Sequence, residues 1–437
     1  MHASSYSAPP WTAPTAATAL NAVVPIPGSK SLTNRELILS ALADSPSLLR
    51  GALHSRDTDL MIRALTQLGA QIEIRGTEAA VRPLPAQTEV LDAPVPDTPL
   101  HIDCGLAGTV MRFVPPVAAL LHRHVAFDGD AAARRRPMEP LLEALRGLGA
   151  RISSATGGLP FEIASGTRLR GGALQITAAA SSQFVSALLM VGPLLPGGLR
   201  LEDQGPKPPS LPHIEMTLDC LKLRGVPARA IDERHWEVEE APIRGRELSV
   251  EPDLSNAAPF LSAAAVTGGK VGIPDWPTRT TQVGARFPGL LTRLGAEVEQ
   301  DQTGLFVRGT GTLHGIEIDL GEAGELVPTF SAVLALADSP STIRGVGHLR
   351  GHETNRLRAI VEDLRALGGR AEELEDGLRI TPVPLHGGLW KAYGDHRMAT
   401  AGALLGLVVP GVVVDDIAST TKTLPNFTDL WTGMLAA

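Results

Sequence analysis

Hydrophobic residues gather along this chain in short helical segments that are apolar on nearly every side and polar only where they begin. A helix on a protein surface keeps one polar face, so segments of this kind are expected inside a core. They recur at steps of roughly 70–76 residues, which indicates an internal repeat. The six polar starts are Thr33, Thr109, Ser182, Ser255, Glu325 and Asp395.

A second, amphipathic helix follows most of the apolar ones and ends in a glycine. Glycine is typical of a helix end because it adopts the left-handed backbone that other residues avoid. Short alternating strands lie between and after the helices. Each repeat is therefore predicted to run strand, helix, strand, helix, strand, strand. The glycines that end the second helices are Gly69, Gly149, Gly225, Gly295 and Gly368.

Six such repeats predict an α/β (α+β) fold of two similar domains, each with three βαβαββ units and buried inner helices, and a cleft between the domains. The expected domains are residues 30–252 and residues 17–29 with 253–437. Residues 1–16, rich in Ser, Ala, Pro and Thr, are expected to be a disordered tail. The sixth repeat lacks its closing strands, and residues 21–26 are expected to supply them.

The start of the first inner helix carries charges of the wrong sign. Thr33 and Glu36 have the Thr-x-x-Glu spacing of a capping box, which predicts that the helix begins at Thr33. Lys30 and Arg35 flank this start, although the helix dipole favours anions there and a misplaced cation costs roughly 0.3–1 kcal/mol. A bound anion would reverse that cost. This stretch is therefore predicted to hold a phosphate or a carboxylate.

Composition narrows the function classes. With 437 residues, 43% hydrophobic and 20% charged, the chain has the balance of a globular protein. Its net charge of −8 argues against a nucleic-acid partner. The longest apolar run, residues 401–414, is too short and interrupted for a membrane span. Cys104 and Cys220 cannot build a disulfide framework and residues 1–17 lack a signal-peptide pattern, so a cytoplasmic location is expected.

Several cations stand in settings that suit an anion. Only six of the 39 basic residues are Lys, and Lys30 and Lys422 both lie among small polar residues. Two glycines and Thr109 precede Arg112, which favours close backbone approach to a ligand. Arg136, fixed before Pro137, is the best candidate among three consecutive arginines.

Two other stretches supply hydrogen-bonding and ionisable groups. Residues 180–184 place hydroxyls and an amide at a helix start, where they could bind a phosphate or serve as ordinary caps. Glu353 stands three residues before Arg356, and Glu325 opens the preceding inner helix; two carboxylates among many cations suit acid–base work. His122 and His124 have no partner motif, so no metal site is predicted, and the glycine spacings do not match nucleotide-binding loops.

The chemically loaded motifs occur in a fixed order along the chain. They are Pro-Gly-Ser-Lys-Ser-x-x-Asn-Arg (27–35), Gly-x-Ala-Gly-Thr-x-x-Arg (105–112), Arg-Pro-Met (136–138), Ser-Ser-Gln-Phe (181–184), His-Glu-Thr-x-Arg (352–356), Asp-His-Arg-Met-Ala (395–399) and Thr-Lys-Thr-x-Pro (421–425). Together they resemble the 5-enolpyruvylshikimate-3-phosphate (EPSP) synthase family over essentially residues 20–437.

The resemblance implies an activity and a set of partners. The family transfers the enolpyruvyl group of phosphoenolpyruvate to the 5-hydroxyl of shikimate 3-phosphate and releases phosphate, in the shikimate pathway of aromatic amino-acid biosynthesis. It uses no metal or organic cofactor and is the target of glyphosate. The expected partners are therefore these two small molecules, with no nucleic acid and no membrane, and the expected state is a monomer.

The resemblance also implies which residues carry the reaction. Glu325 is the expected base for the 5-hydroxyl, Glu353 handles the methylene proton, and Lys30 is the third catalytic residue. Shikimate 3-phosphate is expected to be held by Lys30, Ser31, Arg35, Ser181, Ser182, Gln183, Ser210, Glu325 and His352. Phosphoenolpyruvate is expected to be held by Lys30, Gly108, Arg136, Gln183, Arg356, Arg397 and Lys422.

Some positions depart from the family pattern, and two other functions remain open. Glu325 replaces the usual Asp, His348 and His352 replace the more usual Asn and Lys, and Phe113 stands where many members have Pro. A sister enzyme transfers enolpyruvyl to a UDP-amino sugar, but its reactive Cys is absent from residues 131–133. A non-catalytic anion-binding protein is the second alternative, which the joint presence of the catalytic candidates disfavours.

Overall fold

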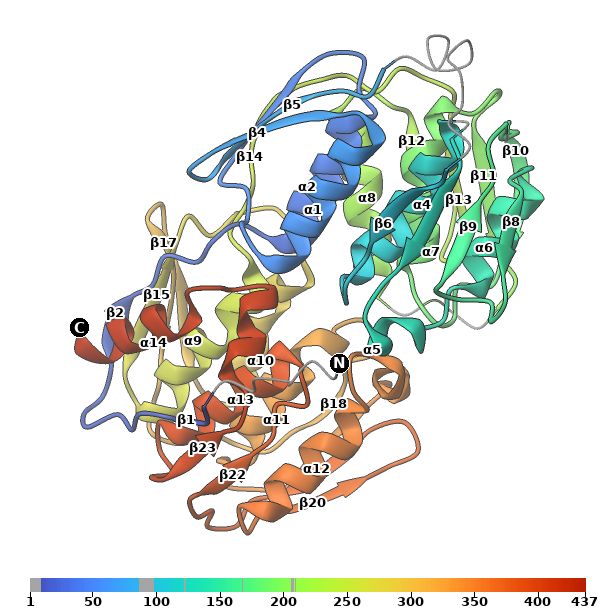
Figure 1. The fold of residues 1–437 in the computed structure, drawn as a ribbon. Helices are drawn as coiled ribbons and strands as arrows, with labels where there is room; N and C mark the ends of the chain where they lie inside the picture. Colours follow the sequence, from blue (N-terminus) through green and yellow to red (C-terminus); the bar gives the residue numbers. More distant parts are fainter. Residues whose placement is uncertain (1–8, 86–97, 122, 167, 206–207, 209) are drawn as a thin grey trace. The chain divides into compact units, whose positions relative to one another are not determined.

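The computed structural model describes residues 9–85, 98–121, 123–166, 168–205, 208 and 210–437, and Figure 1 shows its elements. The chain forms two compact units. We call residues 28–251 the central unit. Residues up to Pro27 together with Pro252–Ala437 form the terminal unit.

The described residues of the central unit form three four-stranded sheets of the same topology, in which the first two strands are parallel and the others antiparallel. The strands, in sheet order, are β14 (Glu247–Ser249), β3 (Ser47–Arg50), β5 (Glu78–Arg82) and β4 (Gln71–Arg75); β6 (Leu100–Asp103), β7 (Val125–Asp128), β9 (Phe161–Ile163) and β8 (Ile152–Ser154); and β10 (Gly172–Ile176), β11 (Leu199–Asp203), β13 (His235–Val238) and β12 (Ala228–Ala230). The helices are α1 (Lys30–Ala41), α2 (Arg56–Leu68), α4 (Gly108–Leu120), α5 (Ala131–Arg134), α6 (Glu139–Gly147), α7 (Gln183–Val191), η1 (Gly192–Leu194) and α8 (Leu211–Leu223).

The terminal unit has two more sheets of this kind and a three-stranded one. The strands, in sheet order, are β2 (Asn21–Val23), β15 (Lys270–Pro274), β17 (Gly304–Arg308) and β16 (Glu297–Gln300); β18 (Glu317–Asp319), β19 (Ser341–Arg344), β21 (Leu378–Thr381) and β20 (Arg370–Glu373); and β1 (Trp11–Thr12), β23 (Val412–Val414) and β22 (Gly388–Trp390). The helices are α9 (Leu254–Thr267), η2 (Val283–Arg286), α10 (Phe287–Arg293), η3 (Gly324–Leu326), α11 (Val327–Leu334), η4 (Gly347–Gly351), α12 (Arg356–Ala366), α13 (His396–Gly406), η5 (Ile417–Lys422) and α14 (Phe427–Ala436).

The six-repeat fold that the hydrophobic pattern predicts is confirmed. Every residue of α4 is buried, as is every residue of α11, so the helices that looked apolar all round do form the cores. The helices α9, α11 and α13 pack on one another in the terminal unit. The second helices end in left-handed glycines as expected, with φ of 119° at Gly69 and 83° at Gly368.

The predicted start of the first inner helix is wrong. Helix α1 begins at Lys30, because the Ser29 side chain accepts a hydrogen bond from the Leu32 N–H at 3.4 Å and caps it one turn earlier. Thr33 instead accepts from the Leu53 N–H at 3.1 Å. Glu36 binds the guanidinium of Arg224 at 2.7 and 2.9 Å inside the core. Both members of the supposed capping box therefore make tertiary contacts.

The prediction that residues 21–26 complete the sixth sheet is also wrong. Residues 21–23 form β2, which pairs in parallel with β15 and opens the fourth repeat. The sixth sheet is completed instead by β1, which pairs antiparallel with β23. The expected disordered tail is accordingly too long: Ala13 is buried and its N–H donates to the Val412 carbonyl at 3.0 Å. Residues 1–8 of that tail lie outside the described residues.

A segment near the N-terminus packs against the C-terminal helix within the terminal unit. Figure 1 shows the C-terminal helix α14 beside β2 from the N-terminal end. Trp431 and Phe427 of α14 pack against Phe260 of α9, with ring centroids 5.3 and 5.8 Å apart. Among the helices that the structure describes, none is long and apolar enough to cross a lipid bilayer.

Candidate active site

In the central unit, side-chain hydrogen bonds join the starts of three inner helices. Asn34 on α1 donates to the Thr109 hydroxyl on α4 at 2.8 Å. Arg112 on α4 donates to the side-chain oxygen of Gln183 on α7 at 2.7 Å. Each helix start presents backbone N–H groups without intrahelical partners. We call this region the central half-site; its candidate ligand-binding residues are Lys30, Ser31, Arg35, Gly108, Arg136, Ser181, Ser182, Gln183 and Ser210.

Gly108 is the first residue of α4, and its open side faces two guanidinium groups. A Cβ placed on it would lie 2.9 and 3.0 Å from the terminal nitrogens of Arg136 and 3.2 Å from one of Arg112. Arg136 donates to the Leu106 carbonyl at 3.4 Å, and its Nε is buried with no hydrogen-bond partner among the described residues. Glycine thus keeps two cations against the start of a buried helix, an arrangement that suits an anion.

Lys30 and Ser31 open helix α1. The Lys30 ammonium lies 3.5 Å from the carboxylate of Asp57, and the lysine side chain is 20% exposed while the aspartate is 3% exposed. Asp57 therefore orients the ammonium from the protein side and leaves part of its surface open to a second anion.

Arg35 lies deeper than the other candidate cations. Its side chain is buried, donates to the hydroxyl of Thr217 at 2.8 Å and to the carbonyl of His213 at 2.9 Å, and stands 5.3 Å from the ring centroid of Phe113. Because α1 begins at Lys30, Arg35 falls in its second turn and connects α1 to α8. Its contact with shikimate 3-phosphate stays a prediction.

The other three predicted serines lie at two helix starts. Ser181 accepts from the Gln183 N–H at 3.3 Å, and Ser182 is the residue before α7 but makes no side-chain capping bond. Ser210 precedes α8 with a left-handed backbone, φ 56°. Ser181, Gln183 and Ser210 are partly exposed, whereas Ser182 is buried.

In the terminal unit, a chain of ion pairs links the stretches before α12 and α13. Glu353 accepts from Lys422 at 2.5 Å and from Arg356 at 3.1 Å. Arg356 binds both oxygens of Asp395, at 2.7 and 3.2 Å. Burial lowers the pKa of Arg356, but Asp395 and Glu353 outweigh it and hold that pKa above its ordinary value. Arg356 therefore keeps its charge. We call this cluster, with Glu325, Arg397, His348 and His352, the terminal half-site.

Glu325, in η3, lies beside a third cation of the same cluster. It accepts a hydrogen bond from Ser255 on α9, and its carboxylate is 4.0 Å from Arg397. The Arg397 N–H donates to Asp395 at 2.9 Å, which caps α13. The Asp395 carboxylate therefore binds the side chain of Arg356 and the backbone N–H of Arg397.

His348 and His352 complete the terminal half-site. Their ring centroids are 5.8 Å apart, and the His352 Nδ1 lies 4.0 Å from a carboxylate oxygen of Glu353. Burial and then the positive charge of Arg356 lower the pKa of His348, so its imidazole is neutral at pH 7. A Cβ on Gly324 would lie 2.7 Å from the His348 Nε2, so only glycine lets the ring approach η3 so closely.

The structure places the predicted residues in two groups and adds partners that the sequence analysis missed. The central unit carries Lys30, Ser31, Arg35, Gly108, Arg136, Ser181, Ser182, Gln183 and Ser210, and the terminal unit carries Glu325, His352, Glu353, Arg356, Arg397 and Lys422. The added partners are Asp57, which the sequence did not single out, and Ser255 and Asp395, which it marked as polar helix starts without assigning them a partner. A polar residue before a helix start was the available signal for Asp395. Nothing in the sequence marks Asp57 as the partner of Lys30, because tertiary packing makes that pair.

Cations gathered at helix starts in one unit, and carboxylates bound by cations in the other, suit an enzyme that acts on anionic substrates by acid–base chemistry. The family model of EPSP synthase, 3-phosphoshikimate 1-carboxyvinyltransferase, matches residues 14–431. The chain therefore belongs to the EPSP synthase family, and the family and enzyme class that the motifs implied are confirmed.

Individual proteins agree with this assignment. A 3-phosphoshikimate 1-carboxyvinyltransferase of Kocuria rhizophila is 51% identical over 421 residues, which cover 96% of this chain and 94% of that protein. The fold resembles an EPSP synthase of Acinetobacter baumannii, with a TM-score of 0.80, 23% identity and 97% of both chains covered. It also resembles the enolpyruvyl transferase NikO of Streptomyces tendae, with a TM-score of 0.74, 18% identity and 98% and 97% of the two chains covered.

Proposed function

We propose that this protein transfers the enolpyruvyl group of phosphoenolpyruvate to the 5-hydroxyl of shikimate 3-phosphate and releases phosphate. Family membership and the relative at 51% identity support this reaction. The observation that carries it is the position of Glu353, a carboxylate bonded at once to Lys422 and Arg356. It combines a proton-transfer group with the two cations that the family resemblance assigns to phosphoenolpyruvate.

Both substrates are anions, and the central half-site offers them complementary charge. Lys30, Gly108, Arg136 and Gln183 serve phosphoenolpyruvate in this proposal, since Gly108 opens the helix start beside the Arg136 guanidinium. The hydroxyls of Ser31, Ser181, Ser182 and Ser210, with Lys30, Arg35 and Gln183, serve shikimate 3-phosphate. Charge-assisted hydrogen bonds to phosphate are roughly twice as strong as neutral ones.

The terminal half-site supplies the proton transfers. Glu325 takes the proton of the 5-hydroxyl while Glu353 delivers a proton to the methylene carbon of phosphoenolpyruvate, and the hydroxyl oxygen bonds to the neighbouring carbon. This gives a tetrahedral intermediate. Loss of phosphate and of one methyl proton, taken back by Glu353, restores the double bond. Arg356, Arg397 and Lys422 stabilise the negative charge on the leaving phosphate and the carboxylate.

We also propose that the protein works as a monomer in the cytoplasm. Cys104 and Cys220 are both free thiols buried in the central unit, which fits a reducing compartment. Light scattering after gel filtration measures the oligomeric state directly. A mass near twice 45.9 kDa would contradict the monomer.

One assay tests the reaction. Purified protein with phosphoenolpyruvate should release phosphate when shikimate 3-phosphate is added, and none when UDP-N-acetylglucosamine is added. Release with the UDP-sugar alone would establish the sister reaction. If the folded protein releases no phosphate with either acceptor, the remaining function is that of a non-catalytic anion-binding protein.

A further inference from the structure

The segment between β22 and α13, residues 391–395, determines where α13 begins. Its backbone is fixed by hydrogen bonds from the Asp395 N–H to the Ala392 carbonyl at 2.9 Å and from the Ala392 N–H to Asp415 at 2.7 Å. Asp395 then binds Arg356 and caps the Arg397 N–H. A shift of this segment would therefore move both arginines.

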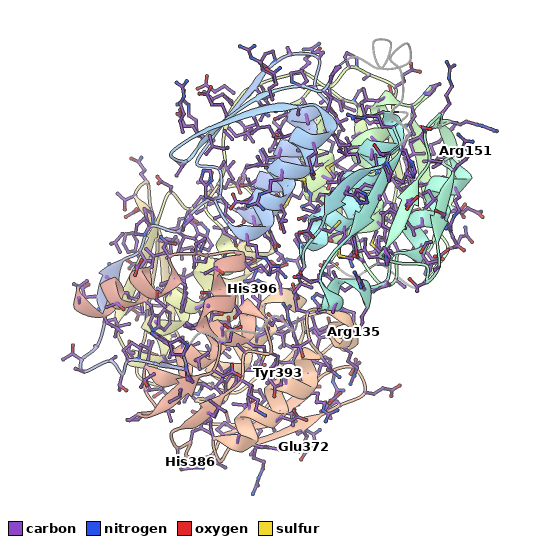
Figure 2. The ribbon with its side chains drawn as sticks, viewed as in Figure 1. Arg135, Arg151, Glu372, His386, Tyr393 and His396 are labelled. Atoms are coloured by element: carbon purple, nitrogen blue, oxygen red, sulfur yellow. The ribbon has the colours of Figure 1, made fainter. Side chains whose placement is uncertain are left out.

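Tyr393, in the middle of this segment, has an unfavourable backbone conformation. Its φ is 56°, in the left-handed region that a residue with a Cβ rarely adopts, whereas Gly394 next to it adopts φ 66° without strain. Such a conformation persists only where surrounding contacts hold it. Tyr393 and His396, the first residue of α13, are both labelled in Figure 2.

The contact that holds Tyr393 comes from α12. The Tyr393 hydroxyl donates to Asp363 at 3.2 Å and approaches Glu362 at 3.4 Å. Asp363 lies seven residues after Arg356, which places the two on one face of α12. Helix α12 is therefore tied to residues 391–395 by the bond of Arg356 to Asp395 and by that of Tyr393 to Asp363.

Asp363, the acceptor of the Tyr393 hydrogen bond, is buried. Asp363 is 2% exposed, and its other carboxylate oxygen is buried with no hydrogen-bond partner among the described residues. Besides Tyr393, the carboxyl group receives a hydrogen bond from the Lys391 N–H, so losing the tyrosine hydroxyl removes one of its donors within residues 391–395.

We propose that Tyr393 is a positioning residue for phosphoenolpyruvate binding. Its hydroxyl, bonded to Asp363, holds residues 391–395 in the strained conformation that lets Asp395 keep Arg356 and Arg397 in place. The inference rests on the proposed function and adds a residue that acts on the substrate through others. The shikimate 3-phosphate ligands of the central unit do not depend on this segment.

The test is steady-state kinetics of the full-length Tyr393→Phe variant, which loses a single oxygen atom. KM for phosphoenolpyruvate should rise roughly three- to tenfold, the range that one lost hydrogen bond gives, while KM for shikimate 3-phosphate changes less than about twofold. The matched control is Thr267→Val, which removes a hydroxyl that donates to the Ala263 carbonyl at 2.7 Å in the same unit. It should leave both KM values unchanged.

Two Asp363 variants test the other end of the bond. Asp363→Asn keeps an oxygen that accepts from Tyr393 and should retain a KM for phosphoenolpyruvate near that of the unmodified protein. Asp363→Leu removes the acceptor and should reproduce the effect of Tyr393→Phe. Equal effects of Asn and Leu would contradict the proposed bond.

Hydrogen exchange supplies a readout that needs no turnover. Amides of residues 391–399 should exchange faster in Tyr393→Phe and at the usual rate in Thr267→Val. An unchanged exchange rate overturns the inference, as does an active Tyr393→Phe enzyme with an unchanged KM for phosphoenolpyruvate. Failure of the proposed function is distinct from both, because the unmodified protein would then release no phosphate.

Discussion

At the residue scale, the chemistry depends on which partner each charged side chain has. Glu353 and Arg356 could have been an exposed pair of little consequence. In the structure Arg356 is 3% exposed and forms an ion pair with Asp395, while Glu353 forms one with Lys422. The Glu353–Arg356 pair therefore belongs to a buried network. Removing one member leaves its partners buried without compensation.

Glu353→Gln tests the proton-transfer role most directly. The amide keeps the size of the side chain but cannot relay a proton, so kcat should fall by about 10²–10⁴-fold while substrate KM values change far less. Glu317→Gln, which alters an exposed glutamate paired with Arg344 in the same unit, should leave kcat unchanged. A Glu353→Gln enzyme with more than about a third of the unmodified kcat would rule out this role.

Asp363 predicts a pH dependence of stability. Burial raises its pKa from 3.8 to about 7, although the Lys391 N–H and the Tyr393 hydroxyl oppose the shift and Asp415 adds to it. Between these values the folded protein holds a proton that the unfolded chain releases, so the free energy of unfolding falls as pH rises. Above about pH 7 the loss is complete.

Denaturant unfolding between about pH 5 and 8 measures this effect. The unmodified protein should lose up to a few kcal/mol relative to Asp363→Asn over this range, since one pKa unit corresponds to about 1.4 kcal/mol. Parallel stability curves for the two proteins would show that Asp363 titrates at its ordinary pKa.

The sequence identifies residues whose role depends on local chemistry. The placement of Gly108 and Lys30 beside helix starts was predictable, because a start needs open backbone or a small cap and these signals lie within a few residues of each. The burial of Arg35 was not, since its partners Thr217 and His213 come from a helix about 180 residues away in the chain. Asp57 as the partner of Lys30 escaped prediction for the same reason.

At the scale of elements, helix ends differ in how well sequence marks them. The C-terminal glycines were predicted correctly because the left-handed backbone is a local requirement that few residues meet. The N-terminus of α1 was not, since Ser29 and Thr33 are both good caps one turn apart. The helix begins after Ser29 because Thr33 and Glu36 make tertiary contacts instead, with the Leu53 N–H and with Arg224.

Strand pairing between distant segments was the least predictable feature. The sequence correctly showed that the sixth repeat lacks its closing strands and that the N-terminal end could contribute. Which N-terminal segment does so depends on packing: β2 is taken by β15, and β1 pairs with β23. A two-residue strand such as β1 carries too little pattern to be recognised from sequence.

The contact between the N-terminal segment and α13 can be tested at Gly406. A Cβ on Gly406, the last residue of α13, would lie well inside contact distance of the Ala13 side chain, so Gly406→Ala should destabilise the full-length protein by about 1–3 kcal/mol. In a chain lacking residues 1–16 the methyl group has room. There the same change should be neutral or slightly stabilising, as alanine in a helix usually is.

Thermal unfolding of the four proteins gives the answer. The expected result is a loss of Tm on Gly406→Ala only when residues 1–16 are present. Equal losses in both backgrounds would mean that the methyl group clashes within α13 and its neighbours, and that residues 11–16 are not packed as described.

At the scale of the whole chain, one unit is inserted into the other. The central unit is a continuous segment that includes three complete four-stranded sheets, because β14 returns at its end to pair with β3. Where the chain passes from one unit to the other, near residues 27–29 and 251–253, the two segments are hydrogen-bonded to each other within each unit. The Ser29 N–H donates to Glu251 at 2.8 Å, and the Asp253 N–H donates to Pro27 at 2.9 Å.

This organisation predicts that residues 28–251 fold alone. The segment owns a hydrophobic core formed by α1, α4, α7 and the three sheets that cover them, and it needs no strand from the terminal unit. An independent domain of this size should unfold in one cooperative transition and give a well-dispersed amide spectrum.

The control is residues 28–245, which lack β14 and leave β3 as an exposed edge next to the start of the first repeat. We expect this shorter segment to unfold at lower denaturant concentration. An unfolded 28–251 segment would mean that the central core depends on the terminal unit, and equal midpoints for the two segments would mean that β14 adds nothing to the first sheet.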